Sequence, residues 1–272
     1  MCASLPLPLK GCNCLRAGSQ PFTLPCMPLL QAFSPLVDLV FPPRCPLCGD
    51  GISTQSGLCV SCWSKLVMPA HPACPSCARP FTQVVAAGTV CAPCLADPPR
   101  HDGIVAATLY NETSRQLVLQ LKHGNRIALA PMLAQVMRAR MPFLDAEWIV
   151  VPVPLHRWRL WRRGYNQAAE LARHIARTSA AALLVDGLRR KKATPSLGGL
   201  GKAARKRALS GAIVASASRA SAIRGRSVVL VDDVLTSGAT SQACVSALKK
   251  AGAKRVVIAC FARVLDEALS ET

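Results

Sequence analysis

The chain has few acidic residues and few aromatic ones. Its 272 residues include 14 Asp or Glu against 33 Lys or Arg, for a formal net charge of +19, and 4% are aromatic. Residues 101–272 hold 27 basic and 11 acidic residues, whereas residues 1–100 hold 6 and 3. This shortage of acids indicates an anionic partner, either nucleic acid or a phosphorylated metabolite. Solubility alone is the other explanation of such a surface.

Long apolar runs are missing as well. No stretch of about 18 residues is free of both proline and charge, so we expect no membrane span. Residues 1–26 lack the basic-then-apolar order of a secretory signal. They are rich in proline and cysteine, so we predict a disordered segment there. Met27 is our hypothesis for the translation start, which detection of residues 1–26 in the natively expressed protein would refute.

Several cofactor motifs are also absent. The chain has neither the glycine fingerprint of dinucleotide-binding domains nor a Walker phosphate loop. Its five histidines form no ligand pattern; they are His71, His101, His123, His156 and His174. These absences argue against a dehydrogenase-type fold and against a P-loop nucleotide hydrolase.

The residues that are present divide the chain into three parts. We predict a tail over residues 1–40, a cysteine-rich module over 41–100, and an α/β domain over 101–272. In the last part, strand-like and helix-like patterns alternate, which is typical of a parallel sheet with crossover helices. The predicted strands are 103–110, 147–154, 226–233 and 254–262, and the predicted helices are 111–124, 128–140, 166–179 and 240–252.

Eight of the 14 cysteines form four Cys-x-x-Cys pairs. They are Cys45 and Cys48, Cys59 and Cys62, Cys74 and Cys77, and Cys91 and Cys94. Tetrahedral zinc takes four thiolates, so eight ligands predict two structural Zn²⁺ ions, with iron–sulfur ligation as the alternative. The spacing leaves open whether the pairs combine in sequence or interleave. Thiolate ligands fit a reducing cytoplasm, and bound metal would supply the folding free energy of so small a module.

Residues 228–240, VVLVDDVLTSGAT, place two acids after a β-branched run. A strand buried on both faces needs such a run, and ligands bind beyond the carboxyl ends of parallel strands. The hydroxyls, the glycine and the start of the following helix together suit a phosphate. Asp232 and Asp233 would accept hydrogen bonds from sugar hydroxyls. An aspartate that only caps the next helix is the alternative.

A second unusual segment follows the strand at 147–154. Four arginines and two tryptophans lie within eight residues, and guanidinium groups both bind phosphate and stack on indole. The five candidates for contact with nucleic acid are Arg157, Trp158, Arg159, Trp161 and Arg162. The segment is predicted as either a helix or a loop. The alternative role is a solvated turn whose tryptophans anchor it to the core.

The motif VVLVDDVLTSGAT resembles the phosphoribosyl pyrophosphate (PRPP) motif of type I phosphoribosyltransferases. The resemblance implies that the α/β domain has their fold, and that Asp232 and Asp233 contact the ribose hydroxyls of PRPP bound with Mg²⁺. It implies that the loop binds the 5-phosphate; its residues are Leu235, Thr236, Ser237, Gly238, Ala239 and Thr240. The implied activity is transfer of the phosphoribosyl group to an acceptor that the sequence does not identify.

The pattern Pro-x-Pro, several arginines, then Arg-Gly-aromatic-Asn-Gln resembles the ComF family. It stands here as Pro152, Pro154, Arg163, Gly164, Tyr165, Asn166 and Gln167, and LKHG around Lys122 is similar to a family segment. The resemblance implies a double zinc ribbon, and a pyrophosphate site made by Pro154, Arg163, Asn166 and Lys122. It also implies a link to DNA uptake in natural transformation, with competence proteins as partners.

Two other functions stay open. One is a competence protein that binds single-stranded DNA, and the other is a regulator that binds PRPP without turnover. Residues 187–207 contain eight basic residues and no acid, and Leu197 stands where the family commonly has glutamine. That segment is interpreted either as part of the site or as a charged surface loop.

Overall fold

The computed structural model describes residues 41–123, 126–191 and 211–265. Tertiary contacts divide the chain between Pro42 and Pro43 into two units, so the cysteine-rich module and the α/β domain fall in one unit. The predicted tail, residues 1–40, lies outside the described residues, as do residues 192–207 of the basic segment. The domain boundaries at 40/41 and 100/101 therefore stay predictions.

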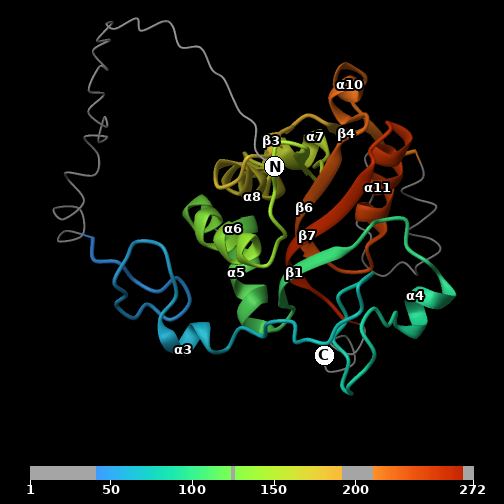
Figure 1. The fold of residues 1–272 in the computed structure, drawn as a ribbon. Helices are drawn as coiled ribbons and strands as arrows, with labels where there is room; N and C mark the ends of the chain where they lie inside the picture. Colours follow the sequence, from blue (N-terminus) through green and yellow to red (C-terminus); the bar gives the residue numbers. More distant parts are fainter. Residues whose placement is uncertain (1–40, 124–125, 192–210, 266–272) are drawn as a thin grey trace, which may run out of the picture. The chain divides into compact units, whose positions relative to one another are not determined.

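A parallel sheet of five strands forms the centre of the α/β domain (Figure 1). Its order is β1-β7-β6-β2-β3, and all four pairings are parallel. The strands are β1 (Ile104–Leu109), β2 (Trp148–Pro152), β3 (Ala182–Leu183), β6 (Ser227–Leu235) and β7 (Arg255–Arg263). The four predicted strands are thereby confirmed, whereas the two-residue edge strand β3 was not foreseen, because it is too short to show a pattern.

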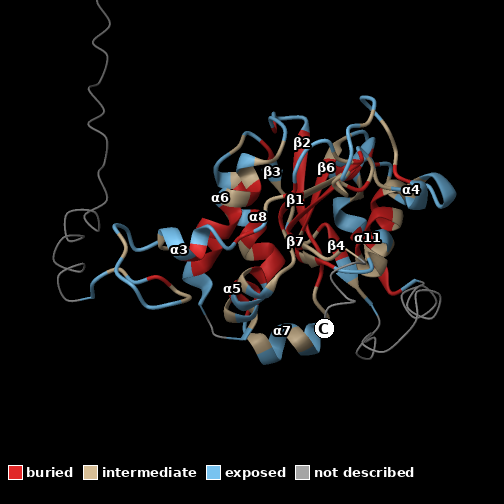
Figure 2. Ribbon diagram, turned by 90° about the horizontal axis from the view of Figure 1, so that it is seen from below, coloured by how far each residue is buried: buried red, intermediate tan, exposed pale blue. Residues whose placement is uncertain are grey.

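Helices cover both faces of this sheet. They are α5 (Glu112–His123), α6 (Ala130–Ala139), α8 (Gln167–Arg177), α10 (Ala220–Ile223) and α11 (Ala239–Lys250), with 3₁₀ turns η1 (Ile127–Leu129) and η2 (Ala217–Arg219). A further helix, α7 (Arg157–Arg163), has no buried residue and does not pack on the sheet. Helices α5, α6 and α8 share one core with Val229 and Val231, while α11 shares the other with Val228 and Leu230. Successive strand residues point to opposite faces, which is why the apolar run of β6 supplies both cores. Figure 2 shows the buried faces of these helices turned toward the sheet.

A short hairpin lies over α11. It joins β4 (Leu188–Arg190) to β5 (Ile213–Ala215) in antiparallel register and packs its Leu188 and Ile213 into the same core as α11. Its first strand includes the start of the basic segment 187–207. Neither strand was predicted from the sequence, because three basic residues in a row hide the half-buried face of β4.

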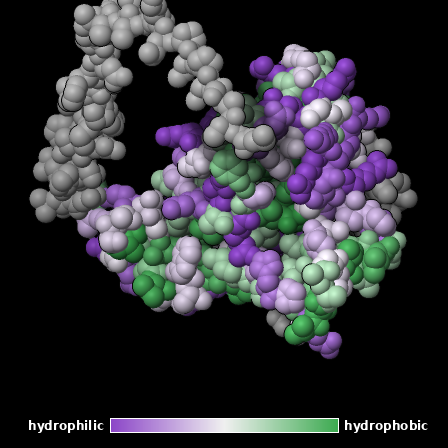
Figure 3. Space-filling model, viewed as in Figure 1, coloured by the Kyte–Doolittle hydropathy of each residue, from purple (hydrophilic) through white to green (hydrophobic). Residues whose placement is uncertain are grey.

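The cysteine-rich module contains two similar halves. In each, a tight turn closes the first Cys-x-x-Cys pair, with Cys45 N–H donating to Asp50 O at 2.7 Å and Cys74 N–H to Arg79 O at 2.9 Å. The second pair then begins a short helix, α3 (Val60–Trp63) or α4 (Ala92–Ala96). Figure 3 shows apolar side chains exposed around α4, which carries the exposed Leu95. Among the described residues, no helix has both the length and the apolar character to cross a membrane.

Candidate functional site

Asp232 and Asp233 lie inside β6, close to where its pairing becomes one-sided. The strand pairs with β2 only as far as Pro152 opposite Val231, but with β7 as far as Leu235 opposite Arg263. The two acids therefore follow directly after the last residue that β2 covers. Leu235, assigned to the phosphate loop, still belongs to the strand and is buried.

The boundary between β2 and β6 is where the sheet reverses its order. From β2 the chain passes through α8 to β3 at one edge, and from β6 it passes through α11 to β7 in the other direction. The helices α8 and α11 pack on opposite faces. Parallel α/β sheets bind ligands in the crevice at such a switch point, at the carboxyl ends of the strands. Both sequence-predicted segments, 232–240 and 154–166, start at this crevice.

Asp233 faces the side of the sheet that carries α5. Its Oδ2 lies 3.1 Å from Nζ of Lys122, and the exposed fractions of the two side chains are 11% and 24%. Its other oxygen accepts a hydrogen bond of 2.7 Å from the backbone N–H of Val234. A carboxylate with this little solvent and a cationic partner is held in one position, which suits the recognition of a hydroxyl.

Asp232 points by strand alternation toward the α11 side. Its Oδ1 accepts a 2.9 Å hydrogen bond from the N–H of Asp233. Burial is the largest influence on this carboxyl and the negative charge of Asp233 the next, and together they raise its pKa to about 8. Asp232 is therefore mostly neutral near neutral pH.

The raised pKa of Asp232 predicts a pH-dependent stability difference. Above about pH 4 the unfolded carboxyl is ionised, whereas the folded one keeps its proton up to about pH 8. The wild-type chain therefore loses stability as the pH rises through this window. Asp232→Asn removes the ionisable group, so the variant does not lose stability in this way. The unfolding free energy of the variant minus that of the wild type should therefore increase from pH 6 to pH 8, reach about 1–3 kcal/mol, and stay constant above pH 8.

Urea unfolding of the zinc-loaded protein at pH 6, 7, 8 and 9 measures this difference. Asp186→Asn is the matched control, because Asp186 pairs with Arg219 on the surface and is half exposed. A stability difference for Asp232→Asn that does not change with pH would contradict the assignment.

The loop after β6 leads into the start of α11. Thr236 and Ser237 are exposed, and Gly238 takes the N-cap position with φ +71°, a left-handed conformation that favours glycine. Space does not require glycine here, since a Cβ would meet its nearest atom, in Leu235, at 3.9 Å. No side chain caps the helix, and the first N–H groups of α11 have no partners inside the helix. Ala239 and Thr240 form its first turn.

The segment after β2 forms helix α7, which begins after His156. The His156 ring accepts a 3.3 Å hydrogen bond from Trp158 N–H, and the helix ends at Gly164 with φ +78°. Trp158 and Trp161 stack with ring centroids 5.3 Å apart and are 62% and 77% exposed. They therefore do not anchor the segment to the core, which removes that alternative.

A cavity of about 650 Å³ opens between α5 and α7. The residues that line it are Lys122, His123, Trp158, Arg159, Trp161, Arg162, Arg163 and Gly164, and they include no acid. The cavity joins the predicted pyrophosphate residues Lys122 and Arg163 to the nucleic-acid candidates. Pro154, Asn166 and Arg157 do not line it.

The motif RGYNQ holds this part of the structure together. Tyr165 Oη donates to the carbonyl of Leu121, at the end of α5. Asn166 donates from Nδ2 to the carbonyl of Val153 at 3.0 Å, and its Oδ1 accepts from Ala168 N–H at 3.1 Å, which caps α8. Gln167 accepts at Oε1 from Arg163 at 3.4 Å. The side chain of Asn166 is thus already engaged within the protein.

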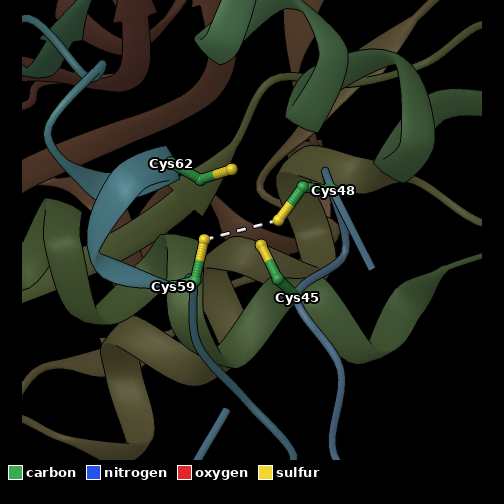
Figure 4. Close-up of side chains that lie close together, drawn as sticks. All are labelled: Cys45, Cys48, Cys59 and Cys62. Carbon is green, nitrogen blue, oxygen red and sulfur yellow. Dashed lines mark hydrogen bonds between the residues drawn. The ribbon is translucent and has the colours of Figure 1, made fainter. Parts of the chain in front are cut away.

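The eight cysteines gather into two sets of four in sequence order. Cys45, Cys48, Cys59 and Cys62 form the first set, and Cys74, Cys77, Cys91 and Cys94 form the second, with all sulfur atoms of a set within 4.8 Å of one another. Figure 4 shows the four sulfurs of the first set pointing at a common centre, with Cys48 and Cys59 3.4 Å apart. Tetrahedral Zn–S bonds of about 2.3 Å place sulfurs about 3.8 Å apart, so the residues fit zinc.

The surroundings of Cys59 in the first set favour thiolate, whereas burial raises the pKa of Cys62. The hydroxyl of Ser61 lies 3.2 Å from the sulfur of Cys59 and is the main cause that lowers the pKa of this thiol to about 6. Thiolate is the form that binds metal. The spacing left open whether the Cys-x-x-Cys pairs combine in sequence or interleave. The positions of the sulfur atoms show that they combine in sequence.

Comparison with known proteins agrees with both halves of the structure. The model of the double zinc ribbon domain matches residues 36–95, and that of the phosphoribosyl transferase domain matches residues 161–271. The DNA utilization protein YhgH of Escherichia coli K12 is 30% identical over 234 residues, which cover 84% of this chain and all of that protein. Competence protein F of Haemophilus influenzae is 29% identical over 227 residues, covering 81% of this chain and 96% of that protein.

The chain belongs to the ComF family. The resemblance noted in the sequence is thereby confirmed, together with the phosphoribosyltransferase-type fold and the double zinc ribbon. Among solved structures, an allosteric regulatory enzyme of purine biosynthesis matches 52% of this chain and 29% of its own, at 20% identity and a TM-score of 0.36. A likeness this weak carries no argument about activity.

The structure identifies two side chains of this ComF-family protein whose contacts could not be predicted from the sequence. Tyr165 and Gln120 anchor the end of α5, which carries Lys122. Tyr165 belonged to the family motif, but its partner could not be found from sequence because the two segments are distant in the chain. Gln120 gave no signal at all, since it resembles any polar residue on a helix.

Proposed function

We propose that this protein binds PRPP at the crevice between β2 and β6 and transfers its phosphoribosyl group to a nitrogen-containing acceptor. The observation that carries the proposal is the position of Asp233: a largely buried carboxylate at the switch point, beside the uncapped start of α11. In this arrangement one ligand reaches both a hydroxyl acceptor and a phosphate-binding helix start. The proposal also places the protein in the cytoplasm, where the thiolates of the ribbon stay reduced.

Each part of the crevice would contact a different part of the substrate. Thr236, Ser237 and the first N–H groups of α11 hold the 5-phosphate. Asp232 and Asp233 hold the ribose hydroxyls. Lys122 and Arg163 face the pyrophosphate, with Pro154 and Asn166 fixing the backbone that leads to α7. PRPP would bind together with Mg²⁺, which would reduce the charge of the pyrophosphate and keep several of its own waters rather than take many protein ligands.

The reaction is a displacement at the anomeric carbon. A nitrogen lone pair of the acceptor forms the new bond, and the bond to pyrophosphate breaks with its electron pair passing to the leaving oxygen. Positive charge develops on the sugar ring, and the carboxylate of Asp233 stabilises it while Lys122 and Arg163 stabilise the departing anion. The protein contributes orientation and electrostatics, and forms no covalent intermediate.

Calorimetric titration with PRPP and Mg²⁺ tests the binding step. Release of pyrophosphate across a panel of nucleobases tests the transfer. Binding without pyrophosphate release would instead support a regulator that binds PRPP without turnover. An absence of binding would overturn the proposal.

A second function, binding of single-stranded DNA, is favoured by the exposed tryptophans of α7. Their stacked indoles stand beside Arg159 and Arg162 at the rim of an acid-free cavity. Proteins that bind single strands combine such a basic surface with aromatic rings on which bases stack. The names of the relatives, which concern DNA utilization and competence, fit a role in DNA uptake with competence proteins as partners.

We expect the double variant Trp158→Ala, Trp161→Ala to bind a single-stranded oligonucleotide about 10- to 100-fold more weakly, since each stacked base contributes about 1–3 kcal/mol. The slope of affinity against salt should not change, because the phosphate contacts remain. Fluorescence anisotropy at several salt concentrations measures both. Trp63→Ala is the control, as Trp63 is a part-exposed tryptophan on α3. Equal affinities of the double variant and the wild type would argue against this function.

A further inference from the structure

Helix α5 is fixed at both ends by the first half of the zinc ribbon. Near its start, Asn111 Nδ2 donates to the carbonyl of Lys65 at 2.7 Å, and Leu109 N–H donates to Val67 at 2.7 Å. Near its end, Gln120 Nε2 donates to the carbonyl of Pro46 at 2.8 Å. Pro46 lies between two ligands of the first zinc site, so this bond joins the helix directly to the metal-binding turn.

The same carbonyl receives a second donor. Arg126 Nη1 lies 3.3 Å from Pro46 O and 3.2 Å from Oε1 of Gln120. Gln120 therefore uses both ends of its amide, donating to the ribbon and accepting from Arg126. A side chain held on both sides has little freedom to turn, which makes the link to the ribbon specific.

Lys122 follows Gln120 by two residues on α5, and its side chain contacts Asp233. Residues two apart on an α-helix project about 200° apart, so one side of the last turn contacts the ribbon while the other reaches the acid. Leu121 between them is fully buried, and its carbonyl accepts from Tyr165. The last turn of α5 is thus held by hydrogen bonds on both sides of Leu121. Because one of these bonds is to the ribbon turn at Pro46, a shift of that turn would move Lys122 relative to Asp233.

The second zinc site is placed differently. Cys74, Cys77 and Cys91 pack in a cluster of their own, whose contact with the α/β domain includes Ile104 of β1. By contrast, Leu66 of the first half belongs to the main core together with Leu117 and Leu121 of α5. The two halves of the ribbon therefore pack against different parts of the α/β domain: the first against α5 and the second against β1.

We propose that Gln120 is a positioning residue, through which the first zinc site sets the place of Lys122 opposite Asp233 and thereby the affinity for PRPP. The part that concerns PRPP rests on the function proposed above. The coupling itself concerns only residues of this chain. It does not extend to the second zinc site.

A double-mutant cycle tests whether Gln120 acts through Lys122. Gln120→Met keeps the length of the side chain but removes the hydrogen bond to Pro46, and we expect PRPP to bind about five- to tenfold more weakly. In a Lys122→Met background the same substitution should have no further effect. Gln116→Met is the matched control, because Gln116 lies one turn earlier on the exposed side and contacts Glu112. An equal loss from Gln120→Met in both backgrounds would overturn the proposal.

Equilibrium competition with a coloured zinc chelator gives a readout that does not need PRPP. Lys122→Met should weaken the binding of one of the two zinc ions several-fold, because coupling between sites is reciprocal. In a Gln120→Met background, Lys122→Met should leave the zinc affinity unchanged. If wild-type protein fails to bind PRPP, the proposed function is wrong, and the zinc affinities still decide the coupling. Zinc affinities that are unaffected by Lys122→Met would refute it.

Discussion

Asp233→Asn should weaken PRPP binding about 10- to 150-fold. The substitution keeps the shape of the side chain but removes the charge, and charge-assisted hydrogen bonds contribute about 1.5–3 kcal/mol each. It also leaves the ammonium group of Lys122 without the carboxylate that lies 3.1 Å away in the free protein. Isothermal titration calorimetry with PRPP and Mg²⁺ at pH 7 measures the effect.

Two comparisons make this result specific. Asp232→Asn should have a smaller effect at pH 7, because the raised pKa of Asp232 leaves that side chain mostly neutral before substitution. Asp186→Asn should have none, because the Asp186 carboxylate pairs with Arg219 on the surface. If Asp233→Asn binds PRPP as tightly as the wild type, the assignment of the crevice as a ribose site is wrong.

Removal of the first zinc ion should unfold its half of the ribbon and destabilise the α/β domain with it. Structural zinc contributes about 10 kcal/mol or more to the folding of such modules. When the first half unfolds, Leu66 leaves the main core, which it shares with Leu117 and Leu121. Loss of a buried leucine from a core costs about 2–5 kcal/mol. Cys59→Ser should therefore lower the urea midpoint of the whole unit.

Cys77→Ser at the second site is the matched comparison. It should also lose one equivalent of zinc, but the main transition should move by no more than about 1 kcal/mol, because its cluster is separate. Zinc content by mass spectrometry and urea unfolding by circular dichroism measure the two effects. Equal shifts of the main transition in both variants would show that the halves of the ribbon support the domain equally.

Local patterns were enough for much of the fold. The β-branched run of β6, the helix stripe of α8 with Leu171 and Ile175, and the N-cap Asn166 all follow from rules that act over a few residues. The same is true of the eight cysteines as ligands, since their spacing alone indicates a metal. Where such signals were weak, as in β3 and β4, the elements were missed.

The sequence by itself determined the ligand types, the PRPP-like motif and the alternation that makes a parallel sheet. Only the tertiary structure decided which cysteines share a site, which face of the sheet Asp233 points to, and that Lys122 meets Asp233. The physical reason is the separation in sequence over which each interaction acts. Ligand chemistry and strand propensity depend on near neighbours, whereas the meeting of α5, β6 and the first ribbon turn depends on how the sheet and its cores pack, which no short stretch of sequence encodes.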